Sequence, residues 1–133
     1  MKPKFDTIGQ IKQGNPRSAH EHTSAFEVAT ELLHSRYSGM PVVDKNNRVI
    51  GVVSEQDLLR ALREPRSFEE IKVNDIMTQS PVVIEEKTTL EEASKIMEDS
   101  HIHRLPVVKD GVLVGTVNRH DLLRAWLGMS AEL

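Results

Sequence analysis

The stretch Asp121-Leu122-Leu123-Arg124-Ala125 occurs twice in this chain of 133 residues, since the same letters stand at 57–61. Pro41-Val42-Val43 likewise returns as Pro106-Val107-Val108. The two spacings are 64 and 65 residues, so the copies agree in order and nearly in length. Self-similarity at a fixed period marks repeated structural units, and the sequence therefore predicts a tandem pair of one supersecondary unit.

Each copy is predicted to open with a helix. Ser24-Ala25-Phe26-Glu27 and Thr88-Thr89-Leu90-Glu91 have the Ser/Thr-x-x-Glu form of a capping box, which satisfies backbone donors at a helix start. Apolar residues at helical spacing then predict the buried face of each helix. These residues are Phe26, Ala29, Leu32 and Leu33 in the first copy, and Leu90, Ala93, Ile96 and Met97 in the second.

A hairpin and a second helix are predicted to follow in each copy. The hairpin strands are expected at 40–43 and 49–53, and again at 105–108 and 112–117, because polar turns separate these apolar runs. The second helices carry apolar residues at matching places, namely Leu58, Leu59, Ala61 and Leu62, and then Leu122, Leu123, Ala125 and Trp126. Exposed apolar positions among them would make a helix-to-helix dimer seam, and Trp126 and Met129 are expected in the core or at that seam.

One further strand is predicted before the first helix of the second copy, at Val82-Val83-Ile84. Ser18-Ala19-His20 replaces it in the first copy, so the strand there is either short or absent. The predicted fold class is therefore α/β (α+β), with two βαββα-type repeats. One copy is too small to bury both helices and both sheet faces, which favours packing of the two about a pseudo-twofold axis. The expected boundaries are 1–64 for the first repeat, 65–72 for a linker, and 73–133 for the second repeat.

Composition excludes several classes of protein. The net charge of −3 gives no electrostatic reason to expect binding to nucleic acid or to a membrane surface. No apolar run approaches the roughly 20 residues that span a bilayer, and the N-terminus lacks the pattern of a secretory signal. The absence of cysteine excludes disulfides, thiol catalysis and thiolate metal sites. A cytoplasmic location is the simplest expectation.

Together these motifs resemble those of a pair of CBS domains, also called a Bateman module. The resemblance runs from about residue 5 to residue 127 and rests on Asn74-Asp75-Ile76-Met77-Thr78, the apolar-Pro-Val-Val strands and the duplicated Gly-x-x-x-x-x-Asp segments. It implies a regulatory module that binds AMP, ADP, ATP or S-adenosylmethionine in the cleft between the repeats. It also implies a homodimer, and a regulated partner protein that the sequence does not identify.

The segments that lead from strand to helix hold the first candidate ligand residues. Ser54 and Asp57 in the first copy, and Asn118 and Asp121 in the second, stand where the family places a phosphate contact and a ribose carboxylate. Helix N-termini favour phosphate, and Arg119 next to Asn118 would add positive charge. The same spacing is also that of a helix N-cap, and the two roles are compatible.

A basic pair supplies the second set of candidates. Ile102-His103-Arg104-Leu105-Pro106-Val107 resembles a segment of the γ subunits of AMP-activated protein kinases, in which His and Arg meet nucleotide phosphates. The planar fork of Arg suits a phosphate because it donates two hydrogen bonds at once. Since Ser38-Gly39 replaces the pair in the first copy, we expect one well-occupied site and one weak or empty site. The alternative is that His103 and Arg104 form only a solvated approach to a strand.

Three classes of function remain to be weighed. A nucleotide sensor is favoured, with no obligatory cofactor. A dimeric scaffold without a ligand is the alternative. It is favoured because Asn118 replaces the hydroxyl residue usual in the family, and because the strand at Ser18-Ala19-His20 in the first copy is weak. An enzyme is not expected, because no nucleophile with a base, no paired carboxylates and no Walker-type glycine loop are evident. No metal is expected either, although His20-x-His22 and His101-x-His103 have a spacing that can ligate one.

Overall fold

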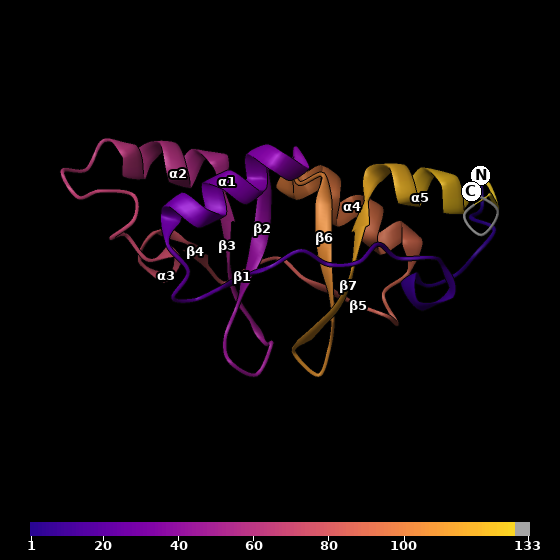
Figure 1. The fold of residues 1–133 in the computed structure, drawn as a ribbon. Helices are drawn as coiled ribbons and strands as arrows, with labels where there is room; N and C mark the ends of the chain where they lie inside the picture. The colour runs from indigo at the N-terminus through magenta and orange to yellow at the C-terminus, as the bar shows by residue number, and fades with distance from the viewer. Residues whose placement is uncertain (130–133) are drawn as a thin grey trace. The chain divides into compact units, whose positions relative to one another are not determined.

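The chain folds into two compact units, one of them continuous in sequence and one discontinuous (Figure 1). The computed structural model describes residues 1–129. The continuous unit is Arg17–Pro81, and the discontinuous unit joins Met1–Pro16 to the chain from Val82 onward. Each unit combines one sheet with helices, so the predicted α/β class is confirmed.

The continuous unit holds a four-stranded sheet in the order β1-β2-β3-β4. Strand β1 runs parallel to β2, whereas the pairs β2–β3 and β3–β4 are antiparallel. Its elements are β1 (Ala19–His20), α1 (Ala25–Ser35), β2 (Gly39–Val43), β3 (Val49–Ser54), α2 (Glu55–Leu62), α3 (Val73–Ile76) and β4 (Thr78–Gln79).

The discontinuous unit holds a three-stranded sheet in the order β5-β6-β7, with β5 parallel and β7 antiparallel to β6. Its elements are the 3₁₀ turn η1 (Ile8–Gln10), β5 (Ile84–Glu85), α4 (Leu90–Ser100), β6 (Arg104–Lys109), β7 (Val112–Asn118) and α5 (Arg119–Trp126). The helix, hairpin and helix predicted for each copy are thus confirmed.

The strand that precedes the first helix is short in both copies. Ala19 of β1 pairs with Val42, just as Ile84 of β5 pairs with Val107. The first copy therefore has the strand that the sequence left in doubt. In the second copy the strand begins two residues later than predicted, because the backbone pairs with β6 only from Ile84 onward.

The helix starts confirm one predicted cap and correct the other. Ser24 caps α1 as predicted, and its Oγ accepts the N–H of Glu27 at 3.2 Å. The cap of α4 is Thr89, one residue later than predicted, and it forms a reciprocal box with Glu92. Thr88 instead accepts the N–H of Glu85 at 3.0 Å in the preceding turn. The sequence Thr-Thr-Leu-Glu-Glu allows a box of Thr88 with Glu91 or of Thr89 with Glu92. Because Thr88 is engaged in the preceding turn, the helix begins after Thr89.

The predicted buried face is right for α4 and half right for α1. Helix α4 buries Leu90, Ala93 and Met97 as expected. Helix α1 buries Leu32 as predicted, and Ala29 packs partly buried against the core. Phe26 and Leu33, also predicted to be buried, are 53% and 76% exposed, and Ala25 and Val28 are buried in their place. The second helices bury their first leucine and their alanine, and Leu59, Leu62 and Leu123 lie exposed.

Polar residues and a glycine shape the turns of the two hairpins. In the first hairpin Asp44 Oδ1 accepts the N–H groups of Asn46 and Arg48, at 2.8 and 3.1 Å. These bonds also hold the pKa of Asp44 below its ordinary value. In the second hairpin Asp110 and Gly111 both have positive φ, as a tight hairpin turn requires.

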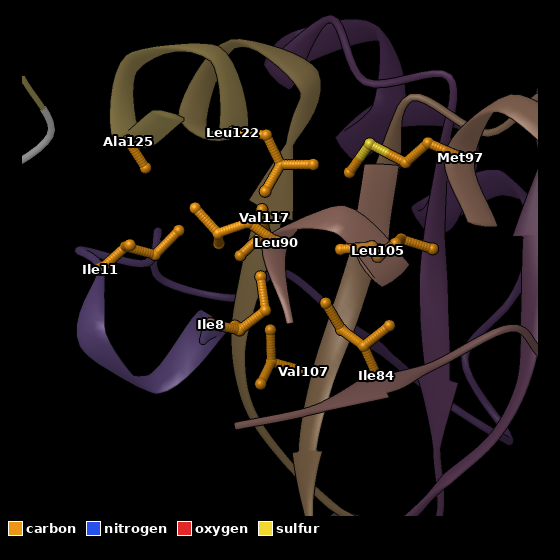
Figure 2. Close-up of a cluster of buried hydrophobic side chains, with 11 residues drawn as sticks. Ile8, Ile11, Ile84, Leu90, Met97, Leu105, Val107, Val117, Leu122 and Ala125 are labelled. Carbon is orange, nitrogen blue, oxygen red and sulfur yellow. The ribbon is translucent and has the colours of Figure 1, made fainter. Parts of the chain in front are cut away.

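Each core includes residues from outside the sequence copy that forms most of it. In the discontinuous unit Ile8 and Ile11 point into the cluster around Val107 and Val117 (Figure 2). In the continuous unit Ile71 and Val73 join the core formed by the first copy. The stretch expected as a linker, 65–72, is thus partly packed, and Ile71 O accepts the N–H of Ala25 at 2.8 Å.

The C-terminal end of the described chain is anchored to its beginning. Trp126 is half-buried against the core of the discontinuous unit, and its Nε1 donates to Met1 O at 3.0 Å. Met129 is 47% exposed and so lies outside the core of this unit, and its alternative place at a dimer seam stays a prediction. Across residues 1–129 every helix is too short or too polar to traverse a lipid bilayer.

Candidate ribose and phosphate site

Asp121 is held at the start of α5 by a reciprocal capping box. The backbone N–H of Asn118 donates to Asp121 Oδ2 at 2.9 Å, and the N–H of Asp121 donates to Asn118 Oδ1 at 2.7 Å. The cap alternative raised by the sequence is therefore correct. It leaves the second carboxylate oxygen of Asp121 for other work, because each oxygen accepts separately.

The N-terminal segment lies across β7 beside this carboxylate. Gly14 and Thr116 exchange both backbone hydrogen bonds, at 3.0 and 3.2 Å, so residue 14 adds a bridge to the edge of the sheet. The neighbouring Gln13 side chain occupies the space over Gly115, where a Cβ would collide with it. This packing brings Lys12 and Gln13 close to the helix start.

These residues enclose a small polar cavity of about 100 Å³, lined by Lys12, Gln13, Gly14, Asp121 and Arg124. Lysine and arginine can meet a phosphate, and a carboxylate can accept hydrogen bonds from ribose hydroxyls. Sites for whole small ligands are typically about 300–1,000 Å³, so the cavity is the size of a part of a nucleotide.

Arg124 is turned toward the preceding turn of its own helix. Its Nη2 lies 2.9 Å from His120 Nε2. Because a guanidinium group only donates hydrogen bonds, His120 Nε2 is the acceptor in this contact. Among residues 1–129, Asp121 Oδ1 accepts no hydrogen bond.

The first copy repeats the capping box with a different outcome. Ser54 N donates to Asp57 Oδ2 at 2.9 Å, and Asp57 N donates to Ser54 Oγ at 3.1 Å. Here Arg60 Nη1 donates to Asp57 Oδ1 at 3.2 Å, so both carboxylate oxygens are engaged. Asp57 is also only 6% exposed.

In the continuous unit, strand β4 pairs with β3. This pairing corresponds to that of Gly14 with β7 in the discontinuous unit. Thr78 pairs with Val52, the position that corresponds to Thr116. A Cβ on Gly51 would lie 2.9 Å from Thr78 O, so glycine is required for this close approach. The two copies therefore build the same local frame around Asp57 and Asp121.

The structure separates the basic pair predicted from the sequence. His103 precedes β6 and lines a second, open cavity of about 520 Å³ together with Asn118, Arg119, His120 and Leu123. Arg104 is the first residue of β6, pairs with Asn118 across the hairpin, and is half-buried. It does not line this cavity.

A third cavity of about 540 Å³ opens on the helical side of the discontinuous unit. It lies between α4 and α5, and its lining includes Met97, Ile102, Leu122 and Trp126, with His103 and Arg119 at its edge. His103 and Arg119 thus belong to the helical side of the unit. They are not brought into the cavity of Asp121.

Sequence reasoning missed Lys12, Gln13, Gly14 and Arg124. In the sequence, Ile8 and Ile11 of the first copy align with Val73 and Ile76 of the second, which matches residues 8–16 with the segment that carries the family's linker phrase. That match could not show that residues 12–14 pack against the second copy. Metal ligation also finds no support among the described residues, where no three His, Asp or Glu side chains gather to hold an ion.

Comparison with known proteins shows the family to which this chain is related. The family model for the CBS domain matches residues 8–64 and again residues 73–128. CBSX1, a chloroplastic CBS domain-containing protein of Arabidopsis thaliana, is 36% identical over an alignment 134 residues long, gaps included, and the alignment covers 79% of this chain and 57% of CBSX1. This chain therefore spans little more than half the length of that relative.

Solved structures show the same fold. CBSX2 of Arabidopsis thaliana in complex with AMP is 32% identical, has a TM-score of 0.78, and is matched over 92% of this chain and 97% of that chain. The CBS domain pair of protein MJ0100, solved with 5′-methylthioadenosine and S-adenosyl-L-methionine, is 25% identical, with a TM-score of 0.73 and coverage of 89% and 97%. The chain thus belongs to the CBS domain family and carries two copies of the domain.

Proposed function

We propose that this chain is a regulatory module that binds an adenine nucleotide or a related adenine compound and thereby modulates a partner protein. The family supports this proposal, as do the ligands of two similar structures, AMP in CBSX2 and S-adenosylmethionine with methylthioadenosine in MJ0100. All these ligands share an adenosine core, so a ribose contact is the common requirement.

The observation that carries the proposal is the carboxylate of Asp121. Its capping box fixes one oxygen and leaves the other unpaired, next to Lys12 and at the edge of a polar cavity. A fixed carboxylate oxygen accepts hydrogen bonds from vicinal ribose hydroxyls without first losing side-chain entropy. Lys12 would then meet the 5′ phosphate, with Arg124 available from α5.

The remaining predicted residues differ in how strongly the structure favours each of them as a ligand contact. Asp57 and Ser54 offer the same frame in the first copy, where Arg60 already occupies the carboxylate. Asn118 acts through the cap of Asp121. Arg104 is retained as a candidate phosphate contact from the start of β6. His103 and Arg119 line the helical side and are the least favoured as ligand contacts.

Regulation would follow from a difference in nucleotide affinity between two arrangements of the protein, since a ligand shifts an equilibrium only by that difference. We infer that the partner that responds is another protein or another part of a longer chain. No group of residues described above resembles a catalytic site, and we propose a regulatory role in place of a catalytic one.

A thermal-unfolding screen tests the proposal. The purified protein would be heated with AMP, ADP, ATP, S-adenosylmethionine, adenosine and a GTP control. A ligand at about 100 times its Kd adds about 2.7 kcal/mol, which moves the midpoint of a domain of this size by several degrees. A rise confined to adenine compounds would support the proposal. The absence of any rise at millimolar concentrations would overturn it.

A dimeric docking scaffold is the second candidate, and exposed apolar side chains favour it. Leu33 is 76%, Leu62 60% and Leu123 63% exposed on helices of their own units. Such side chains favour burial against another protein surface, including a second copy of this chain. Sedimentation with and without AMP separates the candidates, because a pure scaffold would dimerise without binding the nucleotide.

A further inference from the structure

The two copies use the same arginine differently. Arg60 and Arg124 stand three residues after Asp57 and Asp121, in identical Asp-Leu-Leu-Arg-Ala segments. Arg60 donates to Asp57 Oδ1 at 3.2 Å, whereas Arg124 lies 2.9 Å from His120 Nε2. One carboxylate is thus neutralised by its own helix and the other is not.

The residue that differs at this point is the one before the aspartate. His120 stands in the second copy where Gln56 stands in the first. Residues 120 and 124 lie one helical turn apart on the same face, so their side chains meet. The imidazole has fewer rotatable bonds than the glutamine amide, so it presents its acceptor nitrogen to Arg124 at a smaller cost in conformational entropy.

We propose that His120 is a positioning residue that holds Arg124 off Asp121 and so makes the discontinuous unit the higher-affinity nucleotide site. This inference rests on the proposed function, since it concerns which of the two carboxylates a ribose can use. In the first copy a ribose must displace Arg60 before it can reach Asp57 Oδ1.

The arrangement has a second consequence for the ligand. Arg124 still lines the cavity of Asp121, beside Lys12. Its charge therefore stays near the expected phosphate while the carboxylate remains open to the ribose. Loss of the His120 contact would allow Arg124 to pair with Asp121, as Arg60 pairs with Asp57, and both contacts to the ligand would suffer.

Exchange of the two residues tests this inference. His120→Gln makes the second copy read as the first, and Gln56→His is the reciprocal change. Calorimetric titration of each variant with adenosine, AMP and adenine is the measurement. We expect His120→Gln to weaken adenosine and AMP about tenfold, the equivalent of about 1.4 kcal/mol. Adenine, which has no ribose, should bind unchanged, and Gln56→His should strengthen a second, weaker binding event for adenosine.

A double variant separates positioning from damage to the helix. In an Arg124→Met background, no guanidinium remains to close Asp121, so His120→Gln should no longer affect adenosine. An equal loss in both backgrounds would overturn the inference. A crystal structure of the unliganded His120→Gln variant should place the Arg124 guanidinium on Asp121 Oδ1, and an Arg124 that stays away from Asp121 would also overturn it.

The failure of this inference is distinguishable from that of the proposed function. If the unaltered protein binds no adenine nucleoside, both fail. If it binds adenosine and His120→Gln binds it equally well, the proposed function stands and the role of His120 is refuted.

Discussion

At the scale of single residues, Asp121 caps a helix and still keeps one carboxylate oxygen available to a ligand. A carboxylate has two oxygens, and the capping box uses Oδ2 alone. The same sequence spacing in the first copy yields a carboxylate with both oxygens occupied. The carboxylates of two identical short motifs therefore differ in their availability to a ligand, because Arg60 donates to Asp57 whereas Arg124 contacts His120.

Removal of this carboxylate should separate ribose recognition from base recognition. We expect Asp121→Ala to weaken AMP and adenosine by about tenfold or more, because a hydrogen-bonded charged group contributes about 1.5–3 kcal/mol. Free adenine should be affected far less. Isothermal titration is the measurement, and Asp57→Ala, which removes a carboxylate already paired with Arg60, is the matched control with a smaller expected loss. Equal losses for adenosine and adenine would refute the ribose role.

Lys12, which lines the cavity of Asp121, and Arg104, the candidate phosphate contact at the start of β6, should determine the preference for phosphorylated ligands. Lys12→Ala and Arg104→Ala are each expected to weaken AMP and ATP several-fold while adenosine binding stays within about twofold, since the lost contact is to the phosphate. Lys87→Ala is the matched control, because its side chain is 84% exposed and lies outside the cavity. A variant with an unchanged ratio of AMP to adenosine affinity would exclude that residue from the phosphate site.

At the scale of elements, the cap of α4 predicts a dependence of stability on pH. Backbone and side-chain hydrogen bonds from Thr89 lower the pKa of Glu92. A carboxyl with a lowered folded-state pKa stabilises the protein above its unfolded pKa, and that contribution is lost as the pH falls through the folded pKa.

Glu92→Gln tests this dependence, because the amide keeps an acceptor for Thr89 N–H without a charge. The Tm of the unaltered protein should exceed that of the variant more at pH 7 than at about pH 3, below the ordinary pKa of Glu. Differential scanning calorimetry is the measurement. Glu91→Gln, an exposed neighbour, should show a smaller change with pH. The same change in both variants would show that the cap of Glu92 is not its source.

The elements were largely predictable, but the buried face of α1 was only partly so. Helix α1 has one broad apolar face, with Phe26 and Leu33 at one edge of it and Val28 toward the other. Helical period alone cannot decide which part of so broad a face is buried. Contact with the sheet chooses, and it buries Val28 and Leu32. Helix α4 has a single apolar face, for which the prediction was correct.

At the scale of the whole molecule, sequence repeats and packing units are divided at different places. The family model matches residues 8–64 and 73–128, yet Met1–Pro16 packs with the chain from Val82 onward. Ile8, fully buried, belongs to the same cluster as Leu105 and Val107 (Figure 2). The N-terminal segment is therefore part of the structural unit that contains the second copy.

Ile8→Ala tests this packing. Truncation of a buried isoleucine leaves a cavity and costs about 2–5 kcal/mol. Trp126, the only tryptophan of the chain, lies in the same unit and reports its unfolding by fluorescence. We expect the urea concentration at the midpoint of this unfolding transition to be lower for Ile8→Ala than for the unaltered protein. Leu33→Ala, at a position 76% exposed, should change stability by no more than about 0.5 kcal/mol. An unchanged midpoint in Ile8→Ala would contradict the assigned packing.

The sequence by itself determined the repeat, the order of helices and hairpins in each copy, and the capping segments that hold Asp57 and Asp121. These are local properties, because turn residues, caps and apolar periods act over a few neighbouring positions. Only the tertiary structure decided that residues 12–14 lie beside Asp121, that α1 buries Val28 in place of Phe26, and that Arg124 turns to His120. The first two outcomes depend on contacts between residues far apart in sequence, which a local pattern does not encode. The third depends on the competition of His120 and Asp121 for one guanidinium, which the repeated Asp-Leu-Leu-Arg-Ala segment alone does not reveal.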